Sequence, residues 1–307
     1  MNAVMNAATK NQQLAPHSQQ QLALMLGAIP GAELHEIQMK LPMPPPDHRL
    51  YYGDSSHSFG DLRLPKGTVS APYPVAVVIH GGCWKSEHDL DHISHLCARL
   101  AEVGIATWSL EYRRLGDPGG GWPGTFIDVG AGTDYLRTLA QQFPLDLDRV
   151  AFVGHSAGGQ LALWLAARAK FTHHSPLFSA APLPALGVVA LAPISDLYTY
   201  GATPGSCNDA VTMLLDGSAA QVPERYIQAS PIALLPLGVP QHIFHGNIDT
   251  VVPVAHSMRY AARAMNVDDD ARLYLIDDAG HFDLIAPFTD AWKEVEAALC
   301  AMLNQED

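Results

Sequence analysis

The ten residues 150–159 constrain the fold of this chain more than any other stretch. An apolar, β-branched run leads into small residues around Ser156, and an alanine-rich run over residues 160–169 follows. This succession predicts a strand, a tight turn and a helix. Gly154, Ser156 and Gly158 fit the Gly-x-Ser-x-Gly pattern, in which small flanking residues let the chain bend so tightly that the serine hydroxyl projects above the sheet.

The predicted turn also favours negative charge. Ser156 and Ala157 stand at the start of the predicted helix, where backbone N–H groups have no partner within the helix and the helix dipole attracts anions. The serine is therefore a candidate nucleophile, and the N–H of Ala157 is a candidate donor to an oxyanion. A structural Gly/Ser turn is the alternative, so the rest of the chain has to supply the partners that a nucleophile needs.

Strand and helix signals alternate along most of the chain. This alternation predicts an α/β fold, a doubly wound and mostly parallel sheet with helices on both faces. Strands of the buried, parallel kind are predicted at residues 73–80, 105–110, 150–155, 186–192, 241–244 and 272–276, and helices at 91–103, 125–143, 160–169 and 290–303. Three short extended segments, 33–41, 48–52 and 62–64, are predicted as antiparallel edge strands.

One region interrupts the alternation. Residues 195–237 carry no strong strand signal, and proline and glycine residues divide them into short helical pieces. We expect a cap-like insertion that lies over the carboxyl ends of the strands and shapes a pocket there; an irregular surface excursion is the alternative. Residues 31–307 are predicted to form a single domain, preceded by a polar tail or short helix over residues 1–30.

Charge and composition exclude several classes of function. A chain of 307 residues that is 48% hydrophobic can bury a large core, and its net charge of -13 disfavours nucleic acid and anionic membranes as partners. We see neither a signal peptide nor a run of transmembrane length. The four cysteines are far apart and form no Cys-x-x-Cys pair, which predicts free thiols and a cytoplasmic protein. Composition leaves a homodimer open.

A serine hydroxyl needs a histidine base and a carboxylate that orients it, and two later loops supply both. Asp249 lies just past one predicted strand end, and His281 lies just past the next. With Ser156 they follow the chain order serine, acid, histidine, and all three lie at the carboxyl edge of the sheet. We therefore predict a catalytic triad of Ser156, Asp249 and His281. Asp196 is the reserve acid, and Asp277, Asp278 and Asp283 are rivals because they lie close to His281 in sequence.

A second oxyanion donor is predicted in the loop that follows the first buried strand. This oxyanion loop, residues 80–84, reads His-Gly-Gly-Cys-Trp. Its two glycines let backbone N–H groups approach a tetrahedral oxygen without a Cβ in the way. We assign Gly81 and Gly82 to the oxyanion hole beside Ala157, with the amide of Cys83 as a further donor.

These motifs together resemble one known group of proteins. The set formed by the oxyanion loop, Gly154-His-Ser-Ala-Gly158, His245-Gly-Asn-Ile-Asp249 and Gly280-His281 is similar to the α/β-hydrolase esterases, in particular the arylformamidase (kynurenine formamidase) and feruloyl-esterase-like branch. The resemblance covers residues 50–303. It implies an α/β-hydrolase fold, no metal or organic cofactor, and cleavage of small, aromatic carboxylic esters through an acyl-enzyme. Formylkynurenine-like formamides are the alternative substrates, and a non-catalytic ligand-binding protein is the alternative of another class.

Several other residues have both a functional and a structural interpretation. The resemblance suggests that Trp84 contacts substrate, and Trp122 is a second candidate pocket wall; packing under the loop and a structural turn are the alternatives. Arg113 and Arg114 are interpreted as arginines that tie a strand to a loop rather than as a carboxylate site. His88, His92 and His95 are interpreted as a solvated helix face rather than metal ligands, because the triad already accounts for hydrolysis.

Overall fold

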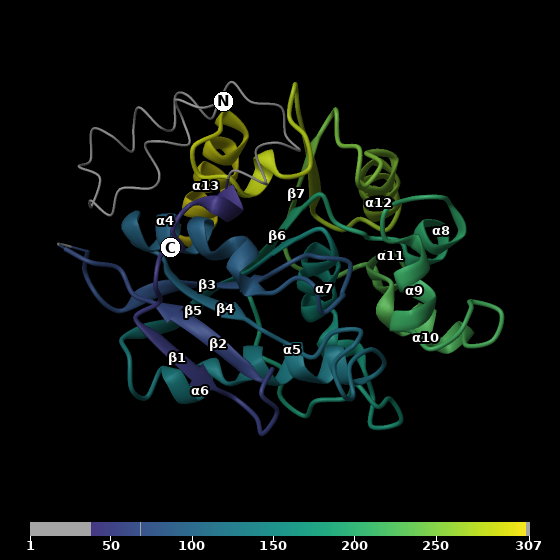
Figure 1. Cartoon of the computed structure of the whole chain (residues 1–307), viewed down its shortest axis with the longest axis horizontal. Coiled ribbons are helices and arrows are strands. Elements are labelled where there is room, and N and C mark those ends of the chain that lie inside the picture. Colours follow the sequence, from purple (N-terminus) through teal and green to yellow (C-terminus); the bar gives the residue numbers. More distant parts are fainter. Residues whose placement is uncertain (1–37, 68, 305–307) are drawn as a thin grey trace.

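The computed structural model describes residues 38–67 and 69–304. Its centre is an eight-stranded sheet with the order β1-β2-β4-β3-β5-β6-β7-β8 (Figure 1). The strands β1 and β2 pair antiparallel with each other, β2 pairs antiparallel with β4, and all later neighbours are parallel. The strands are β1 (His48–Tyr51), β2 (Phe59–Arg63), β3 (Tyr73–Ile79), β4 (Ala106–Leu110), β5 (Leu145–His155), β6 (Gly187–Leu191), β7 (Gln241–Gly246) and β8 (Ala271–Ile276).

Helices cover both faces of the sheet, as predicted. Side chains alternate along β3, so that Val75 and Val77 enter one core while Ala76 and Val78 enter the other. The first core packs against α5 (Gly124–Asp134), α6 (Leu136–Leu139), α7 (Ala157–Ala166) and α12 (Ala255–Met265). The second packs against α4 (Ser94–Glu102), which follows the 3₁₀ turn η1 (Leu90–Ile93), and against α13 (Asp290–Leu303). The doubly wound, mostly parallel α/β architecture is confirmed.

The antiparallel edge is confirmed in two of its three predicted segments. Residues 48–52 and 62–64 correspond to β1 and β2. The third prediction, a strand over residues 33–41, is wrong where the structure describes it, because residues 38–40 are helical. The apolar residues of this segment also fall at helical spacing, and the alternation that we used could not separate the two periods. The predicted tail at residues 1–30 lies outside the described residues.

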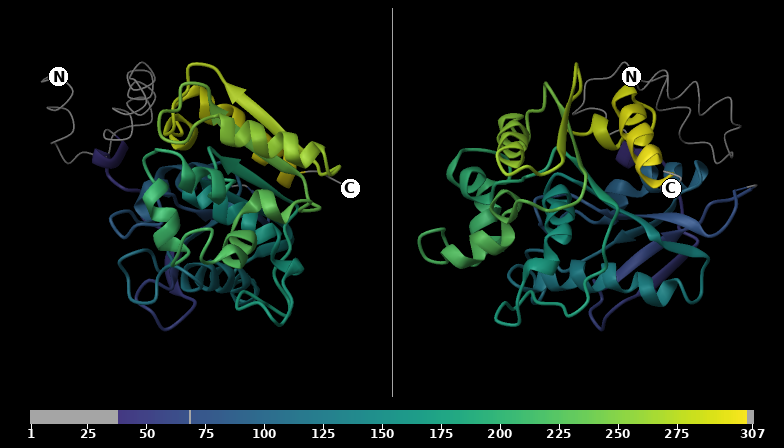
Figure 2. Two further views of the ribbon diagram at one scale, coloured as in Figure 1. Left: turned by 90° about the vertical axis from the view of Figure 1, so that its right-hand side faces the viewer. Right: turned by 180° about the vertical axis from the view of Figure 1, so that it is seen from behind.

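The predicted insertion consists of short helices and contains no strand in the part of the chain that the structure describes. These helices are α8 (Leu197–Ala202), α9 (Asn208–Leu214), α10 (Pro223–Ala229) and α11 (Pro231–Leu234). Figure 2 shows them in green, gathered at one end of the molecule. Two side chains of α7 hold them: Gln160 Nε2 donates to Ala229 O at 2.8 Å, and Trp164 Nε1 donates to Gln228 O at 3.0 Å. The insertion is thereby tied to α7, the helix that follows Ser156.

Candidate active site

The turn at Ser156 has the predicted geometry of a nucleophile elbow. Strand β5 ends at His155, α7 begins at Ala157, and Ser156 between them has φ 58° and ψ −118°. This left-handed conformation is rare for a residue with a side chain and is found at strained functional turns. Both flanking glycines are required, because a Cβ on Gly154 would lie 2.1 Å from Gly158 O and a Cβ on Gly158 would lie 2.1 Å from Ile79 O.

The serine is held at the carboxyl edge of the sheet. The N–H of Ser156 donates to Leu191 O at the end of β6, at 2.8 Å, which fixes the turn between two neighbouring strands. Only 3% of the serine surface is exposed. The next residue, Ala157, opens α7, so its N–H is among those that the helix itself cannot pair.

The structure joins the predicted acid and base directly. Asp249 follows β7 and His281 follows β8, and His281 Nδ1 donates to Asp249 Oδ2 at 2.6 Å. Both side chains are almost fully buried. Because a carboxylate only accepts, Nδ1 carries the ring proton, and Nε2 of the neutral imidazole keeps a free lone pair. This is the tautomer that a general base requires.

Asp249 is built to remain a carboxylate. Its Oδ1 accepts the N–H groups of Val251 at 2.7 Å and Val252 at 2.9 Å. His245 Nε2, which also points at Val252 O, lies 3.4 Å from Oδ2. Burial alone would raise the pKa of this carboxyl, but the hydrogen bonds from His245 and His281 outweigh burial and hold the pKa well below its usual range.

Three of the four rival carboxylates are engaged elsewhere. Asp196 caps α8 by accepting the N–H of Thr199 at 3.1 Å. Asp283 accepts the N–H of Gly280 at 2.8 Å, and Asp277 accepts from Asn247 Nδ2 at 2.8 Å. Asp278 uses its backbone N–H, which donates to Asn247 Oδ1 at 2.9 Å. His281 Nδ1 pairs directly with Asp249, which favours Asp249 over all four rivals as its partner.

The predicted base lies beside the residue that precedes the predicted nucleophile. The rings of His281 and His155 have their centroids 4.4 Å apart, and His155 Nε2 lies 2.9 Å from His281 O. His281 follows the edge strand β8, and two strands, β6 and β7, separate β8 from β5, the strand that ends at His155. Sequence reasoning missed His155, although its place at the end of a buried strand was a signal.

The oxyanion loop packs directly on the elbow. A Cβ on Gly81 would lie 2.8 Å from His155 O and 3.1 Å from Ser156 Cβ, so only glycine allows this close approach. Gly82 has φ +100°, and a Cβ there would lie 2.4 Å from His88 Cβ. Gly81 thus lets the backbone approach the serine, while the assignment of both glycines to an oxyanion hole stays a prediction.

A buried network holds the oxyanion loop in place. His80 Nδ1 lies 2.8 Å from Gly81 O and its Nε2 lies 3.1 Å from Glu111 Oε1, while Tyr112 Oη donates to His80 O at 2.9 Å. Burial alone would raise the pKa of Glu111, but His80 and Arg114 lower it below its usual value. The charged carboxylate therefore anchors the loop from beneath.

The two tryptophans differ. Trp84 is fully buried and has φ 57°, and its Nε1 donates to Gln160 Oε1 at 3.0 Å. Its side chain therefore packs under the loop, which was the alternative to the expected contact with substrate. The oxyanion loop and α10 thus share Gln160 as a common anchor. Trp122 is partly exposed, contacts Phe126 edge to face, and remains a candidate pocket wall.

The prediction that all four cysteines are free is wrong. Cys83 and Cys207 form a disulfide with their Cα atoms 5.3 Å apart, whereas Cys97 and Cys300 are free. The two bonded cysteines are 124 residues apart, and only the packing of the insertion against the oxyanion loop brings them together. This pair also removes the basis on which a cytoplasmic location was predicted.

The disulfide is expected to stabilise the fold and the loop. Replacing Cys207 by serine, or reducing the wild type with dithiothreitol, should lower the free energy of unfolding by about 2–4 kcal/mol, because the bond closes a long loop in the unfolded chain. Thermal unfolding with and without reductant measures this effect. Cys300→Ser is the control and should keep the sensitivity to reductant. A count of four reactive thiols in the unreduced, unfolded wild type, instead of two, would contradict the bond.

The remaining polar groups are mostly structural. Arg114 pairs with Asp117 at 3.1 Å and ties the strand end to a loop, as predicted. Arg113 instead pairs at 2.6 Å with Asp128 of helix α5, so it ties the strand end to a helix. The prediction of a solvated helix face is wrong for His92, because this residue is buried and its Nε2 lies 3.0 Å from His155 Nδ1. Among the described residues, no group of three or more histidine, cysteine or acidic side chains is arranged to hold a metal ion.

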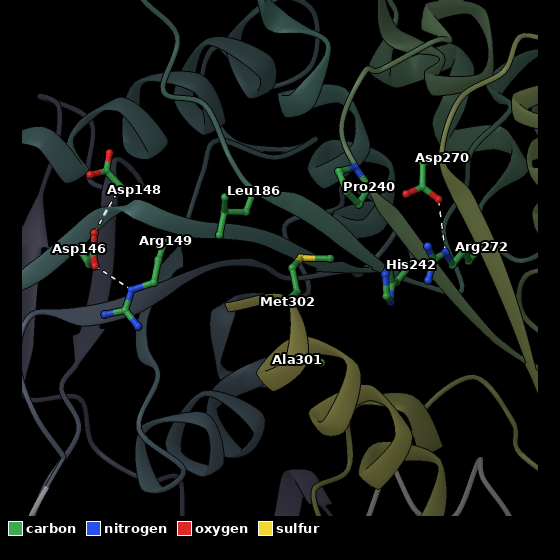
Figure 3. A pocket seen from close by; sticks show the side chains of 10 residues that line it. All are labelled: Asp146, Asp148, Arg149, Leu186, Pro240, His242, Asp270, Arg272, Ala301 and Met302. Carbon is green, nitrogen blue, oxygen red and sulfur yellow. Dashed lines mark hydrogen bonds and ion pairs between the residues drawn. The ribbon is translucent and has the colours of Figure 1, made fainter. Parts of the chain in front are cut away.

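A pocket of about 670 Å³ lies at the opposite, amino-terminal edge of the sheet (Figure 3). It is lined by the first residues of β5, β7 and β8 and by the end of α13. Its arginines are already paired, Arg149 with Asp146 at 2.7 Å and Arg272 with Asp270 at 3.3 Å. We therefore place the candidate active site at the carboxyl edge, where Ser156, Asp249 and His281 lie.

Comparison with known proteins identifies the family. The model of the BD-FAE family matches residues 61–263, more than half of the chain. The chain belongs to the BD-FAE family. The match to these α/β-hydrolase esterases agrees with the feruloyl-esterase-like resemblance seen in the motifs, and it spans the elbow, the oxyanion loop and Asp249.

Individual relatives of this BD-FAE chain are esterases. It is 28% identical over 248 residues to Esterase LipC of Mycobacterium tuberculosis and 24% identical over 242 residues to the probable carboxylic ester hydrolase LipM of that organism. These matches cover 77% and 74% of the chain, but only 60% and 55% of the two relatives.

Solved structures share the fold. Esterase B from Lactobacillus rhamnosis superposes with a TM-score of 0.73 at 19% identity, over 94% of this chain and 95% of that one. A truncated carbohydrate esterase from gut microbiota gives a TM-score of 0.72 at 22% identity, over 84% of this chain and 95% of that one. The α/β-hydrolase fold is confirmed. Within the described residues, no helix combines the length and apolar character needed to cross a bilayer.

Proposed function

We propose that this BD-FAE protein is a serine carboxylesterase. The observation that carries the proposal is the buried hydrogen bond of 2.6 Å between His281 and Asp249, formed beside the elbow that presents Ser156. Membership of an esterase family and the esterase names of the relatives support it. The oxyanion loop, which contacts the elbow at Gly81, supplies the remaining requirement of acyl transfer.

Each residue has one task in the proposed reaction. Ser156 Oγ attacks the ester carbonyl while His281 Nε2 takes its proton, and His281 later returns that proton to the departing alkoxide. Asp249 holds the imidazole in its tautomer and stabilises the imidazolium. The N–H groups of Ala157, Gly81 and Gly82, with that of Cys83 as a further donor, hold the oxyanion. Water then cleaves the acyl-enzyme, with His281 as the base.

Small carboxylic esters with aromatic groups are the proposed substrates. The feruloyl-esterase-like resemblance supports this class, and so does the partly exposed ring of Trp122, which Phe126 holds edge to face. Acyl transfer to serine also serves formamides, so the choice between the two substrates depends on the shape of the pocket and not on the catalytic residues.

A direct comparison of substrates tests the proposal. The purified protein is assayed on p-nitrophenyl acetate, p-nitrophenyl butyrate, methyl ferulate and N-formylkynurenine, and is separately treated with a fluorophosphonate reagent. We expect turnover of the esters and covalent attachment of the phosphonate to Ser156, located by peptide mapping. Preference for N-formylkynurenine would replace the ester by the formamide as substrate. Binding without turnover or labelling would show a ligand-binding protein.

The oxyanion loop gives a further prediction. Gly81→Ala is expected to lower kcat on p-nitrophenyl acetate by about 10²-fold, because the new Cβ meets His155 O and Ser156 Cβ and pushes the donor away. Steady-state kinetics and a thermal melt measure activity and folding separately. Gly205→Ala is the matched control, since its Cβ would meet only the ring of Tyr200 at 3.8 Å or more. A Gly81→Ala variant with kcat within threefold of wild type would remove this loop from the oxyanion hole.

A further inference from the structure

His155 occupies the variable position of the elbow and lies beside three parts of the site. It is 1% exposed, and it is joined to the nucleophile Ser156 by a peptide bond. Its Nε2 lies 2.9 Å from the backbone oxygen of His281, the proposed base. Its Nδ1 lies 3.3 Å from the position that a Cβ on Gly81 of the oxyanion loop would take. One buried residue therefore adjoins the proposed nucleophile, the proposed base and the oxyanion loop.

The hydrogen bonds of this ring have a defined direction. A carbonyl oxygen only accepts, so His155 Nε2 carries a proton and donates it to His281 O. A positive charge on His155 would oppose the imidazolium that forms on His281 in the proposed reaction, because the two ring centroids are 4.4 Å apart. In the neutral ring Nδ1 accepts, and the donor is His92 Nε2 at 3.0 Å.

His92 reaches this point from a different part of the fold. It lies in the turn η1 and is 5% exposed, and its ring contacts Phe282, the residue after the base, at 6.1 Å between centroids. The same turn also holds the oxyanion loop, because the N–H of Leu90 donates at 3.2 Å to Glu111, which contacts His80. The turn η1 thus positions the loop that carries His281 through His92, and it positions the oxyanion loop through Leu90.

We propose that His92 and His155 are positioning residues of the hydrolase reaction. The pair holds the backbone of His281 against His155, the last residue of β5. Because Ser156 follows His155 directly, this contact fixes the distance between the proposed base and the proposed nucleophile. Asp249 orients the imidazole of His281 at Nδ1, while His155 holds its backbone. Neither His92 nor His155 takes part in bond making. The inference rests on the proposed function, because it gives these histidines a task only if His281 is the base.

Removing the donor of the pair should reduce turnover without weakening substrate binding. His92→Leu keeps an apolar volume but leaves Nδ1 of His155 without this partner, and we expect kcat on p-nitrophenyl acetate to fall by about 10²-fold, since small displacements of a reacting group cost this much. KM should change less than about threefold. His92→Gln supplies an amide N–H at a similar reach and should recover at least about tenfold of the loss.

Matched variants separate positioning from folding. His95→Leu changes a half-buried histidine on α4, three residues away, and should keep kcat within about threefold of wild type. His155→Gln retains one donor and one acceptor and should exceed His155→Leu in kcat by about tenfold or more. The double variant His92→Leu, His155→Leu should lose no more than the worse single variant, because both break the same connection. Equal losses in His92→Leu and His95→Leu, or additive losses in the double variant, would overturn the proposal.

A spectroscopic readout keeps this inference independent of the esterase proposal. In protein labelled with ¹⁵N-histidine, the ring nitrogens of His155 should show the Nε2-protonated tautomer at neutral pH, with hydrogen-bonded shifts at Nδ1 that disappear in His92→Leu. These spectra need no substrate, so they remain interpretable if wild type hydrolyses no ester. A cationic or Nδ1-protonated His155 would overturn the arrangement, whatever the activity.

Discussion

Replacing Ser156 by alanine is expected to lower kcat on p-nitrophenyl acetate by about 10⁴–10⁶-fold, with little change in KM. The substitution removes only the hydroxyl at the elbow, and alanine can follow the backbone of the turn about as well as serine. The oxyanion hole and the bound geometry persist, so a residual rate above that of water is also expected. Steady-state kinetics on both proteins measure the ratio, and the fluorophosphonate should no longer label the variant.

A matched serine provides the control for this variant. Ser109 is fully buried in β4, and its Oγ donates to Asp61 O at 3.2 Å, away from the site. Ser109→Ala loses one buried hydrogen bond, about 0.5–1.5 kcal/mol, and should keep kcat within threefold. If Ser156→Ala retained a tenth of the wild-type rate while remaining folded, the covalent mechanism would be wrong.

The sequence was sufficient to predict the sheet and the places where its strands end. Buried strands such as β3 and β7 are short apolar runs, and the predicted 73–80 and 241–244 agree closely with Tyr73–Ile79 and Gln241–Gly246. Because the carboxyl ends of parallel strands share one edge, Ser156, Asp249 and His281 could be grouped before any coordinates were known. The structure joins Asp249 to His281, while the catalytic assignment of all three stays a prediction.

Helix α12 was missed because its buried face is not apolar. Its buried residues are His256, Ser257, Tyr260 and Ala264, whereas Met258 and Met265 are 51% and 76% exposed. Hydrophobic periodicity is a poor guide to the buried face of this helix, because two methionines are exposed while His256 and Ser257 are buried. The buried side chains are instead paired by tertiary contacts, for example Ser257 Oγ with His245 at 2.7 Å.

The sequence also did not predict the contacts between segments that are far apart in the chain. The bond between Cys83 and Cys207 and the contact of His92 with His155 join residues that are 124 and 63 positions apart. Each depends on how a loop folds back over the sheet, which local patterns do not specify. A partial signal existed for His92, since it stands four residues before the buried Leu96 on the same helical stripe.

Replacing Asp249 by asparagine is expected to lower kcat by about 10⁴-fold at neutral pH, the second largest effect in this chain. Asparagine can still accept the N–H groups of Val251 and Val252 through its oxygen, and it then turns its amide toward His281. Because an amide N–H₂ donates, His281 Nδ1 must accept and the ring proton moves to Nε2. The nitrogen that we propose takes the proton of Ser156 is then itself protonated and cannot act as a base.

The pKa of Asp249 sets the pH range over which this comparison is valid. Folding lowers that pKa below its value in the unfolded chain, so the carboxylate stabilises the fold above about pH 4 and loses this contribution as the pH falls further. The acid limb of the wild-type rate profile should therefore not come from Asp249. Kinetics between about pH 6 and 9 lie well above the lowered pKa of Asp249, so the wild-type carboxylate stays charged throughout the comparison.

Asp196→Asn is the control that separates the proposed acid from its reserve. Asp196 caps α8 and contacts Arg259 at 3.3 Å, so its loss should cost about 0.5–2 kcal/mol of stability and change kcat less than about threefold. If Asp196→Asn lost more activity than Asp249→Asn at equal folding, the acid of the triad would be Asp196. The hydrogen bond of 2.6 Å from His281 to Asp249 would then be only structural, and His281 would have to pair with Asp196 instead during turnover.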